Sequence, residues 1–280
     1  MKVVTVRAAF IWLTVVTPPR AGFSTDNRKS IMTFDFKDKV VLITGAGAGL
    51  GYATAVAFAS AGAKIAITDI SQDALDKAVD DLNASGAEVL GLLNDASDSA
   101  DVSAMLAAIV ARFGRLDIAV NNAGTSTQLQ EFHEVGEAEF DRVIAVNLKG
   151  VWLCMQAEIR QMLKQGSGRI VNMASATSRN TFPNASPYVT SKFAVAGLTR
   201  TVAVEYADRD IRINAICPGN VATPLVVSLV EDLSVLATKH AIKRLGTPEE
   251  VANGVMFLAS DLSSFSTGSL LEVDGGWNAI

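Results

Sequence analysis

Short apolar segments alternate with longer segments of helical period along most of the chain. After Lys39, runs rich in Val, Ile and Leu recur, and each is nearly continuously apolar, as expected of parallel strands covered on both faces. The segments between these runs are long enough for right-handed crossover helices. We therefore predict one α/β domain with a doubly wound, parallel, seven-stranded sheet and helices on both faces. The predicted strands are Val40–Thr44, Lys64–Thr68, Val89–Leu93, Ile118–Asn121, Arg169–Met173, Ile211–Ile216 and Leu270–Val273.

Composition narrows the classes of protein that fit this pattern. The chain has 280 residues, 49% of them apolar, and a net charge of -5, so it can bury a large core but lacks the basic surface that nucleic acids require. Its two cysteines, Cys154 and Cys217, lie far apart without histidines at ligand spacing. We therefore predict neither a disulfide nor a metal site, and interpret both cysteines as buried apolar residues of a cytoplasmic protein.

The first 31 residues differ from the rest, because they carry five basic side chains against one acid. Their apolar run, Ala8–Val16, resembles the apolar core of a signal peptide, yet it is too short to span a bilayer, so no membrane association is predicted. Two interpretations stay open. Met32 is the true start, or residues 1–31 are a cleaved targeting segment; in both, the folded domain is predicted to span residues 32–280.

A glycine-rich loop follows the first predicted strand and precedes an alanine-rich helical segment. It reads T-G-x-x-x-G-x-G, with glycines at Gly45, Gly49 and Gly51, and it does not meet the generic G-x-G-x-x-G spacing. Glycines let the backbone turn tightly and approach a pyrophosphate, whose charge is favoured by the N–H groups and dipole at the start of a helix. Strand, glycine loop and helix together predict a dinucleotide site on a Rossmann-type fold.

Asp69 ends the second predicted strand, about 20 residues beyond the glycine loop. A carboxylate there can accept hydrogen bonds from an adenosine ribose and would repel a 2′-phosphate. Ile70 follows it, and the glycine loop contains no Lys or Arg that would neutralise such a phosphate. We therefore predict NAD as the cofactor. The alternative is that Asp69 is a helix N-cap, although Ser71 can cap the same helix.

Tyr188 and Lys192 are four residues apart in a predicted helix and therefore share one face. A tyrosine needs a nearby positive charge to act as an acid or base near neutral pH, because its ordinary pKa is about 10. The other tyrosines, Tyr52 and Tyr206, have no cation four residues on. The pair at Tyr188 is therefore the candidate acid–base centre.

Two further polar positions stand out. Ser175 lies just past the fifth predicted strand, where it can hydrogen-bond a substrate carbonyl, with Thr177 and Ser178 as alternatives. Asn147 interrupts the apolar stripe of a helix predicted over residues 137–164. A buried amide needs hydrogen-bond partners, so we expect backbone or water partners for Asn147.

These motifs, in this order, resemble the short-chain dehydrogenase/reductase family from about Phe36 to the C-terminus. Any one of them is unremarkable, but their order and spacing are jointly specific. The resemblance rests on Thr44, Gly45, Gly49, Gly51, Asp95, Asn121-Asn122-Ala123-Gly124, Asn147, Ser175, Tyr188, Lys192 and Pro218-Gly219.

The resemblance implies a role for each matched residue. Tyr188 is the implied general acid/base, Ser175 polarises the carbonyl, and Asn147 holds a water of a proton relay. Lys192 binds the nicotinamide ribose and lowers the pKa of Tyr188. Asp95 is implied at the adenine, Asn122 at the adenosine side, and Val221 and Thr223 at the nicotinamide carboxamide. The full set of implied cofactor-binding residues is Gly45, Gly49, Leu50, Gly51, Asp69, Asp95, Asn122, Gly124, Tyr188, Lys192, Val221 and Thr223.

The activity implied is hydride transfer between NAD(H) and a secondary alcohol or ketone by a homotetramer. Apolar residues between Val221 and Leu245 suggest a lid over an apolar substrate, or else two short helices packed on the core. Within the family, the segments at 147–164 and 274–277 are most similar to dehydrogenases of cyclic and hydroaromatic alcohols. Two rivals stay open: an NADP-dependent 3-oxoacyl thioester reductase, which Asp69 disfavours, and a nicotinamide-sensing binding protein without turnover.

Overall fold

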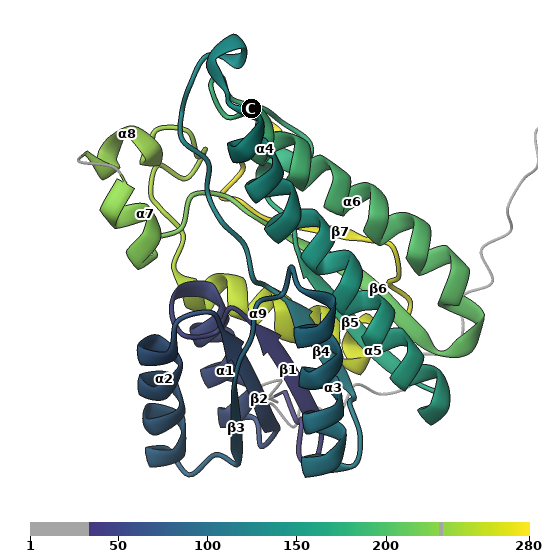
Figure 1. Cartoon of the computed structure of the whole chain (residues 1–280). Coiled ribbons are helices and arrows are strands. Elements are labelled where there is room, and N and C mark those ends of the chain that lie inside the picture. The colour runs from purple at the N-terminus through teal and green to yellow at the C-terminus, as the bar shows by residue number, and fades with distance from the viewer. Residues whose placement is uncertain (1–33, 230–231) are drawn as a thin grey trace, which may run out of the picture. The chain divides into compact units, whose positions relative to one another are not determined.

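The computed structural model describes residues 34–229 and 232–280, so the predicted N-terminal segment of residues 1–31 lies outside the described residues. All seven predicted strands are present and pair in parallel, in the order β3-β2-β1-β4-β5-β6-β7 (Figure 1). The Rossmann-type prediction is confirmed. The strands are β1 (Val40–Thr44), β2 (Lys64–Asp69), β3 (Val89–Leu93), β4 (Ile118–Asn121), β5 (Gly168–Met173), β6 (Ile211–Pro218) and β7 (Leu270–Val273).

Helices cover both faces of the sheet, and successive residues of β1 show why. Val41 and Ile43 belong to an apolar core with α1, α2 and α9, whereas Val40 and Leu42 belong to a second core with α3, α5 and α6. A strand buried on both faces is apolar at every position, which is the pattern that the sequence displays. The helices are α1 (Gly49–Ser60), α2 (Gln72–Ala84), α3 (Ser99–Phe113), α4 (Glu137–Ile144), α5 (Val151–Gln165), α6 (Ser186–Tyr206), α7 (Pro224–Leu229), α8 (Leu233–Ala237) and α9 (Pro248–Ala259).

The strand order reverses between β1 and β4, which lie side by side in the centre of the sheet. The chain leaves β1 toward β2 and β3 on one side, and returns to β4 and the later strands on the other. Ligand crevices of open parallel sheets form at such a switch point, beyond the carboxyl ends of the strands. The glycine loop after β1 and the segment after β4 both start there.

The helix predicted over residues 137–164 is interrupted at its centre. Between α4 and α5, residues Ala145–Gly150 form a π-helical turn, and Asn147 lies fully buried within it. π-helical turns inside α-helices occur frequently at functional sites. Within the described residues, none of the helices has both the length and the apolarity needed to cross a membrane.

Candidate functional site

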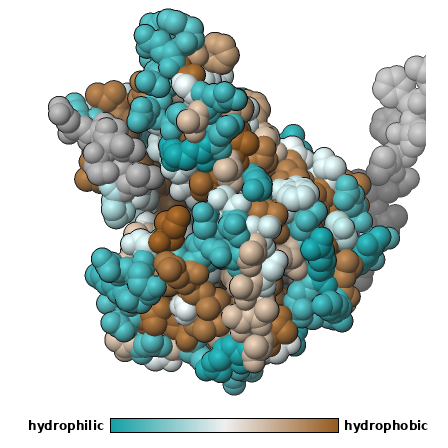
Figure 2. Space-filling model, viewed as in Figure 1, coloured by the Kyte–Doolittle hydropathy of each residue, from teal (hydrophilic) through white to brown (hydrophobic). Residues whose placement is uncertain are grey.

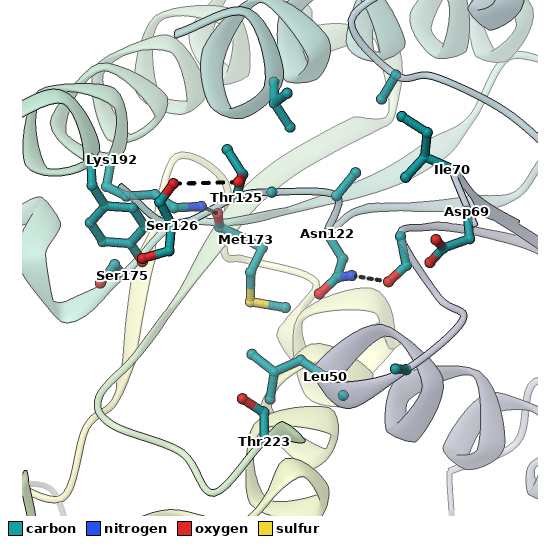
Figure 3. Close-up of a pocket in the computed structure, with 18 of the residues that line it drawn as sticks. Leu50, Asp69, Ile70, Asn122, Thr125, Ser126, Met173, Ser175, Lys192 and Thr223 are labelled. Carbon is teal, nitrogen blue, oxygen red and sulfur yellow. Dashed lines mark hydrogen bonds between the residues drawn. The ribbon is translucent and has the colours of Figure 1, made fainter. Parts of the chain in front are cut away.

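A cavity of about 800 Å³ opens beyond the carboxyl ends of the central strands. Figure 2 shows the surface hollowed between the region of α7 and α8 and that of α1 and α2. Figure 3 places Asp69 toward one end of this cavity and Ser175 toward the other, with Asn122 between them. Twelve of the site residues predicted from sequence line it: Gly45, Gly49, Leu50, Asp69, Asp95, Asn122, Gly124, Ser175, Tyr188, Lys192, Val221 and Thr223. The remaining two, Gly51 and Asn147, do not line it.

Close contacts at two glycines of the glycine loop, Gly45 and Gly51, leave no room for side chains. Gly45 has a φ of 61°, and a Cβ on it would lie 2.8 Å from Cα of Ala123. A Cβ on Gly51 would collide with the carbonyl oxygen of Gly45 and with the amide of Asn122. Nδ2 of Asn122 donates to the carbonyl oxygens of Thr44 and Gly45, each at 2.8 Å. Gly51 and Asn122 therefore support the loop, and α1 begins at Gly49 with its N–H groups at the cavity.

Asp69 is fixed at the end of the cavity by two backbone amides. Its Oδ2 accepts a hydrogen bond from N of Gly47 at 2.9 Å, and its Oδ1 accepts one from N of Ser71 at 3.0 Å. The N-cap of α2 is Ser71, whose hydroxyl accepts from N of Ala74. The helix-cap alternative for Asp69 is therefore wrong, and its carboxylate faces the cavity instead.

Asn94 lines the cavity beside Asp69 and was not predicted from sequence. Its backbone N–H donates to the carbonyl oxygen of Asp69 at 3.0 Å, its side chain is only 5% exposed, and its Oδ1 has no hydrogen-bond partner. The available signal was a polar residue directly after the third predicted strand, at the strand end where ligands of parallel sheets bind. Buried amides usually have partners, so this unpaired oxygen fits a pocket built for a ligand.

Tyr188 and Lys192 lie on one face of α6, and both line the cavity. Nζ of Lys192 donates to the carbonyl oxygen of Met173 at 2.8 Å and lies 5.8 Å from the centre of the Tyr188 ring. Burial lowers the pKa of Lys192 to about 8. Burial raises the pKa of Tyr188 and the Ser175 hydroxyl lowers it, with burial the larger effect. A lowering of the Tyr188 pKa by Lys192 stays a prediction.

Of the three hydroxyls proposed after β5, Ser175 alone lines the cavity. The hydroxyl of Ser178 donates to the backbone carbonyl of Lys192 at 2.8 Å, so it holds α6 in place. Thr177 is buried, and its hydroxyl has no partner. Of the three, Ser175 is therefore the one that faces the cavity, and its hydroxyl contacts Tyr188.

Asn147 finds the backbone partner that its burial requires. Its Oδ1 accepts from N of Thr125 at 2.7 Å, and its Nδ2 donates to the carbonyl oxygen of Thr125 at 3.0 Å and to the hydroxyl of Ser191 at 3.1 Å. A Cβ on Gly124 would lie 3.3 Å from Oδ1 of Asn147 and 3.7 Å from Nζ of Lys192. The side chains of Asn147 and Lys192 thus both approach Gly124 in the cavity wall. Lys192 itself lines the cavity, whereas Asn147 does not.

The segment predicted to be a lid contains both short helices, α7 and α8. Pro224 and Val226 line the cavity together with Met173, so this part of the wall is apolar. Val227 and Val235 are more than half exposed, so they are not packed on the core. The two short helices are therefore present, whereas a lid over the substrate stays a prediction.

The geometry can be compared with known proteins. Residues 45–278 match the family model described as enoyl-(acyl carrier protein) reductase. Cis-4-hydroxycyclohexanecarboxylate dehydrogenase of Sinomonas cyclohexanicum is 41% identical over 88% of this chain and 98% of its own length. Cyclohexanol dehydrogenase of Acinetobacter sp. (strain SE19) is 40% identical over 90% of this chain and 99% of its own.

Solved structures of related proteins are also similar to this chain over most of its length. The crystal structure of levodione reductase superposes with a TM-score of 0.84 at 40% identity, covering 87% of this chain and 99% of that one. The structure of ElxO with NADP bound has a TM-score of 0.82 at 34% identity, covering 86% of this chain and 99% of that one.

Proposed function

The chain belongs to the short-chain dehydrogenase/reductase family, and we propose that it transfers a hydride between NAD(H) and a cyclic secondary alcohol or ketone. Membership makes it an oxidoreductase with a nicotinamide cofactor that acts on alcohols or ketones. One observation carries the finer proposal: Ser175, Tyr188 and Lys192 line the same cavity as the glycine loop and Asp69. A binding protein without turnover has no need for a phenol beside a buried ammonium.

The proposed mechanism assigns the proton to Tyr188. A nicotinamide cofactor supplies the hydride chemistry when bound. Ser175 hydrogen-bonds the substrate oxygen, and the phenolate form of Tyr188 accepts the hydroxyl proton during oxidation. The Lys192 ammonium, 5.8 Å from the Tyr188 ring, favours that phenolate. Asn147 uses both amide hydrogens within the protein, so only the second lone pair of its Oδ1 is free to hold a relay water.

The proposed preference for NAD rests on charge at the Asp69 end of the cavity. Two carboxylates, Asp69 and Asp95, line that end. Among the described residues that line the cavity, the cations are Arg142 and Lys192. Arg142 pairs with Glu139, and Lys192 is held at Met173. Neither is free to neutralise a 2′-phosphate. The NADP bound in ElxO shows that the family also contains the opposite choice.

Asp69→Asn tests this preference, because the amide keeps the size of the side chain but removes its charge. We expect the ratio of kcat/KM for NAD to that for NADP to fall by roughly 100-fold, since hydrogen bonds to charged groups contribute about 1.5–3 kcal/mol and repulsion of the 2′-phosphate is also lost. Asp73→Asn, on the exposed first turn of α2, is the matched control. An unchanged ratio in Asp69→Asn would show that another residue selects the cofactor.

The cyclic substrate is proposed from the relatives that act on cyclohexane derivatives and from the apolar wall of Met173, Pro224 and Val226. The test follows reduced-nicotinamide absorbance with NAD or NADP and a panel of cyclic, steroidal and linear secondary alcohols. Turnover of a cyclic alcohol with NAD supports the proposal. A clear preference for a 3-oxoacyl thioester with NADPH would favour the reductase alternative, and binding of NAD with no turnover would favour the binding protein.

Assembly and location are proposed from the same family. We propose a homotetramer, and the half-exposed aromatic side chains of Trp152 on α5 and Phe193 on α6 support an interface along these helices. Light scattering that finds a monomer would contradict it. The cytoplasm stays the predicted location, supported by Cys154 and Cys217, which are both buried and unpaired.

A further inference from the structure

The loop that follows β4 forms part of the cavity wall although it contains no helix or strand. Its first two residues after Gly124, Thr125 and Ser126, line the cavity. All four residues from Thr125 to Gln128 carry polar side chains. Polar side chains contribute little apolar burial, so we expect the position of this loop to depend on hydrogen bonds from neighbouring elements.

Three side chains from one helical segment supply those hydrogen bonds. Asn147 binds both backbone groups of Thr125. Arg142 donates to the hydroxyl of Thr125 at 2.7 Å and to the carbonyl oxygen of Ser126 at 2.9 Å. Glu139 accepts from the hydroxyl of Thr127 at 2.9 Å and from the backbone N–H of Gln128 at 3.0 Å.

The π-helical turn explains why these three side chains face the same loop. Glu139 and Arg142 are three residues apart on α4 and pair with each other, Nε of Arg142 lying 2.9 Å from Oε2 of Glu139. Asn147 comes five residues after Arg142, which is the spacing of a π-helical turn and not of an α-helix. Hydrogen bonds from Arg142 and then from the Gln128 amide lower the pKa of Glu139 to about 2, so the pair stays charged at neutral pH.

Within this loop the hydroxyl of Ser126 stays almost unused. The hydroxyls of Thr125 and Thr127 are engaged by Arg142 and Glu139, as described above. The Ser126 hydroxyl has one long contact, 3.4 Å to the carbonyl oxygen of Thr127, beyond the usual range for such hydrogen bonds. Figure 3 draws Ser126 at the same end of the cavity as Ser175 and Lys192.

The end of the cavity that holds Ser175 therefore offers more polar groups than the proposed reaction uses. Ser175 and Tyr188 serve the oxygen at the reacting carbon, and Met173 and Val226 add apolar side chains to the wall of the same cavity. Ser126 adds a hydroxyl that can both donate and accept. We propose that Ser126 binds a second oxygen of the substrate, away from the reacting carbon, and that Glu139 and Arg142 are positioning residues for it; this rests on the proposed function. The substrate class is then a cyclic alcohol or ketone with a further oxygen substituent.

The test compares cyclohexanol with the three regioisomers of cyclohexanediol on the wild type and Ser126→Ala. We expect at least one diol to have a higher kcat/KM than cyclohexanol in the wild type, and Ser126→Ala to lower that advantage by roughly tenfold, mainly through KM, as for one lost hydrogen bond. The Kd of NADH should stay unchanged. Ser103→Ala, on the exposed face of α3, is the matched control.

Arg142→Met tests the positioning step, because methionine keeps an unbranched chain but cannot donate. We expect the same loss of selectivity for the diol, and no further loss in the double variant with Ser126→Ala, since both substitutions remove one coupled contact. Arg112→Met removes an exposed ion pair with Glu88 outside the cavity and is the control.

Two outcomes would overturn this inference. One is an equal fall in kcat for cyclohexanol and for every diol in Ser126→Ala, which would place Ser126 at the reacting oxygen. The other is no change in selectivity at all. If the wild type turns over no alcohol, the proposed function fails instead. Calorimetry of the binding of the same alcohols to the NAD complex then still tests whether Ser126 favours the diols.

Discussion

Replacing Tyr188 with phenylalanine is expected to lower kcat for alcohol oxidation by about 10³-fold, within the range found for loss of a positioned acid or base. The substitution removes one oxygen and keeps the ring, which lies beside Lys192. Lys192 remains held by the carbonyl oxygen of Met173, so the cavity wall should persist. The measurement is the steady-state rate of NADH formation at saturating alcohol.

The control for this experiment lies on the same helix. Tyr206 closes α6, and Tyr206→Phe should leave kcat unchanged because that phenol does not line the cavity. The Kd of NADH, measured by fluorescence, should be the same for Tyr188→Phe as for the wild type. Retention of turnover in Tyr188→Phe would transfer the acid–base role to another group, whereas loss of NADH binding would show that Tyr188 shapes the cofactor site.

The sequence predicted the sheet well because its central strands lie between two layers of helices. The alternating assignment of Val40 and Val41 to opposite cores shows that every β1 side chain is buried, which makes the strand signal local and continuous. The residues that we propose for cofactor binding and acid–base catalysis could also be found in the sequence, and most of them line one cavity. Glycines at fixed spacing and a Tyr–Lys pair four residues apart are short-range patterns. They can be recognised in the sequence before the fold is known.

What the sequence could not show are contacts between distant segments. Arg142 and Glu139 have the three-residue spacing of an ordinary helical ion pair, and only the fold brings them to the loop at Thr125. Asn147 was expected to be buried, but its π-helical turn was not predicted, because one extra residue per turn leaves no compositional trace. The sequence likewise could not separate Ser175 from Ser178. Only the fold shows that the Ser178 hydroxyl already donates to a backbone carbonyl of α6, that of Lys192.

Beneath the site, Glu158 of α5 is fully buried in a small polar cluster. Its Oε2 accepts from Nδ2 of Asn121 at 3.1 Å, and the same nitrogen donates to Oδ1 of Asn172. Oε1 of Glu158 and Oδ1 of Asn121 have no partner. Burial raises the pKa of Glu158 to about 8, and the Asn121 hydrogen bond lowers it by less. A protonated carboxyl adds one donor to a cluster that holds two unpaired acceptors.

The raised pKa of Glu158 makes stability fall as pH rises. In the unfolded chain the carboxyl loses its proton near its ordinary pKa of 4.5, whereas the folded protein holds it to about pH 8. The folded state therefore binds more protons throughout this window, and its stability is greatest at the acid end and lost toward pH 8. The shift corresponds to roughly 4–5 kcal/mol of unfolding free energy across the window.

Glu158→Gln should abolish this slope, because the amide keeps the shape and acceptor of the protonated acid without a titrating group. Urea unfolding at about pH 6 and about pH 9 should show the variant more stable than the wild type by several kcal/mol at the higher pH, and by less at the lower one. Glu205→Gln, at an exposed position of α6, should leave the wild-type slope intact. Equal slopes in wild type and Glu158→Gln would mean that Glu158 is ionised in the folded protein, and its unpaired oxygen would then require a partner cation or water inside the core.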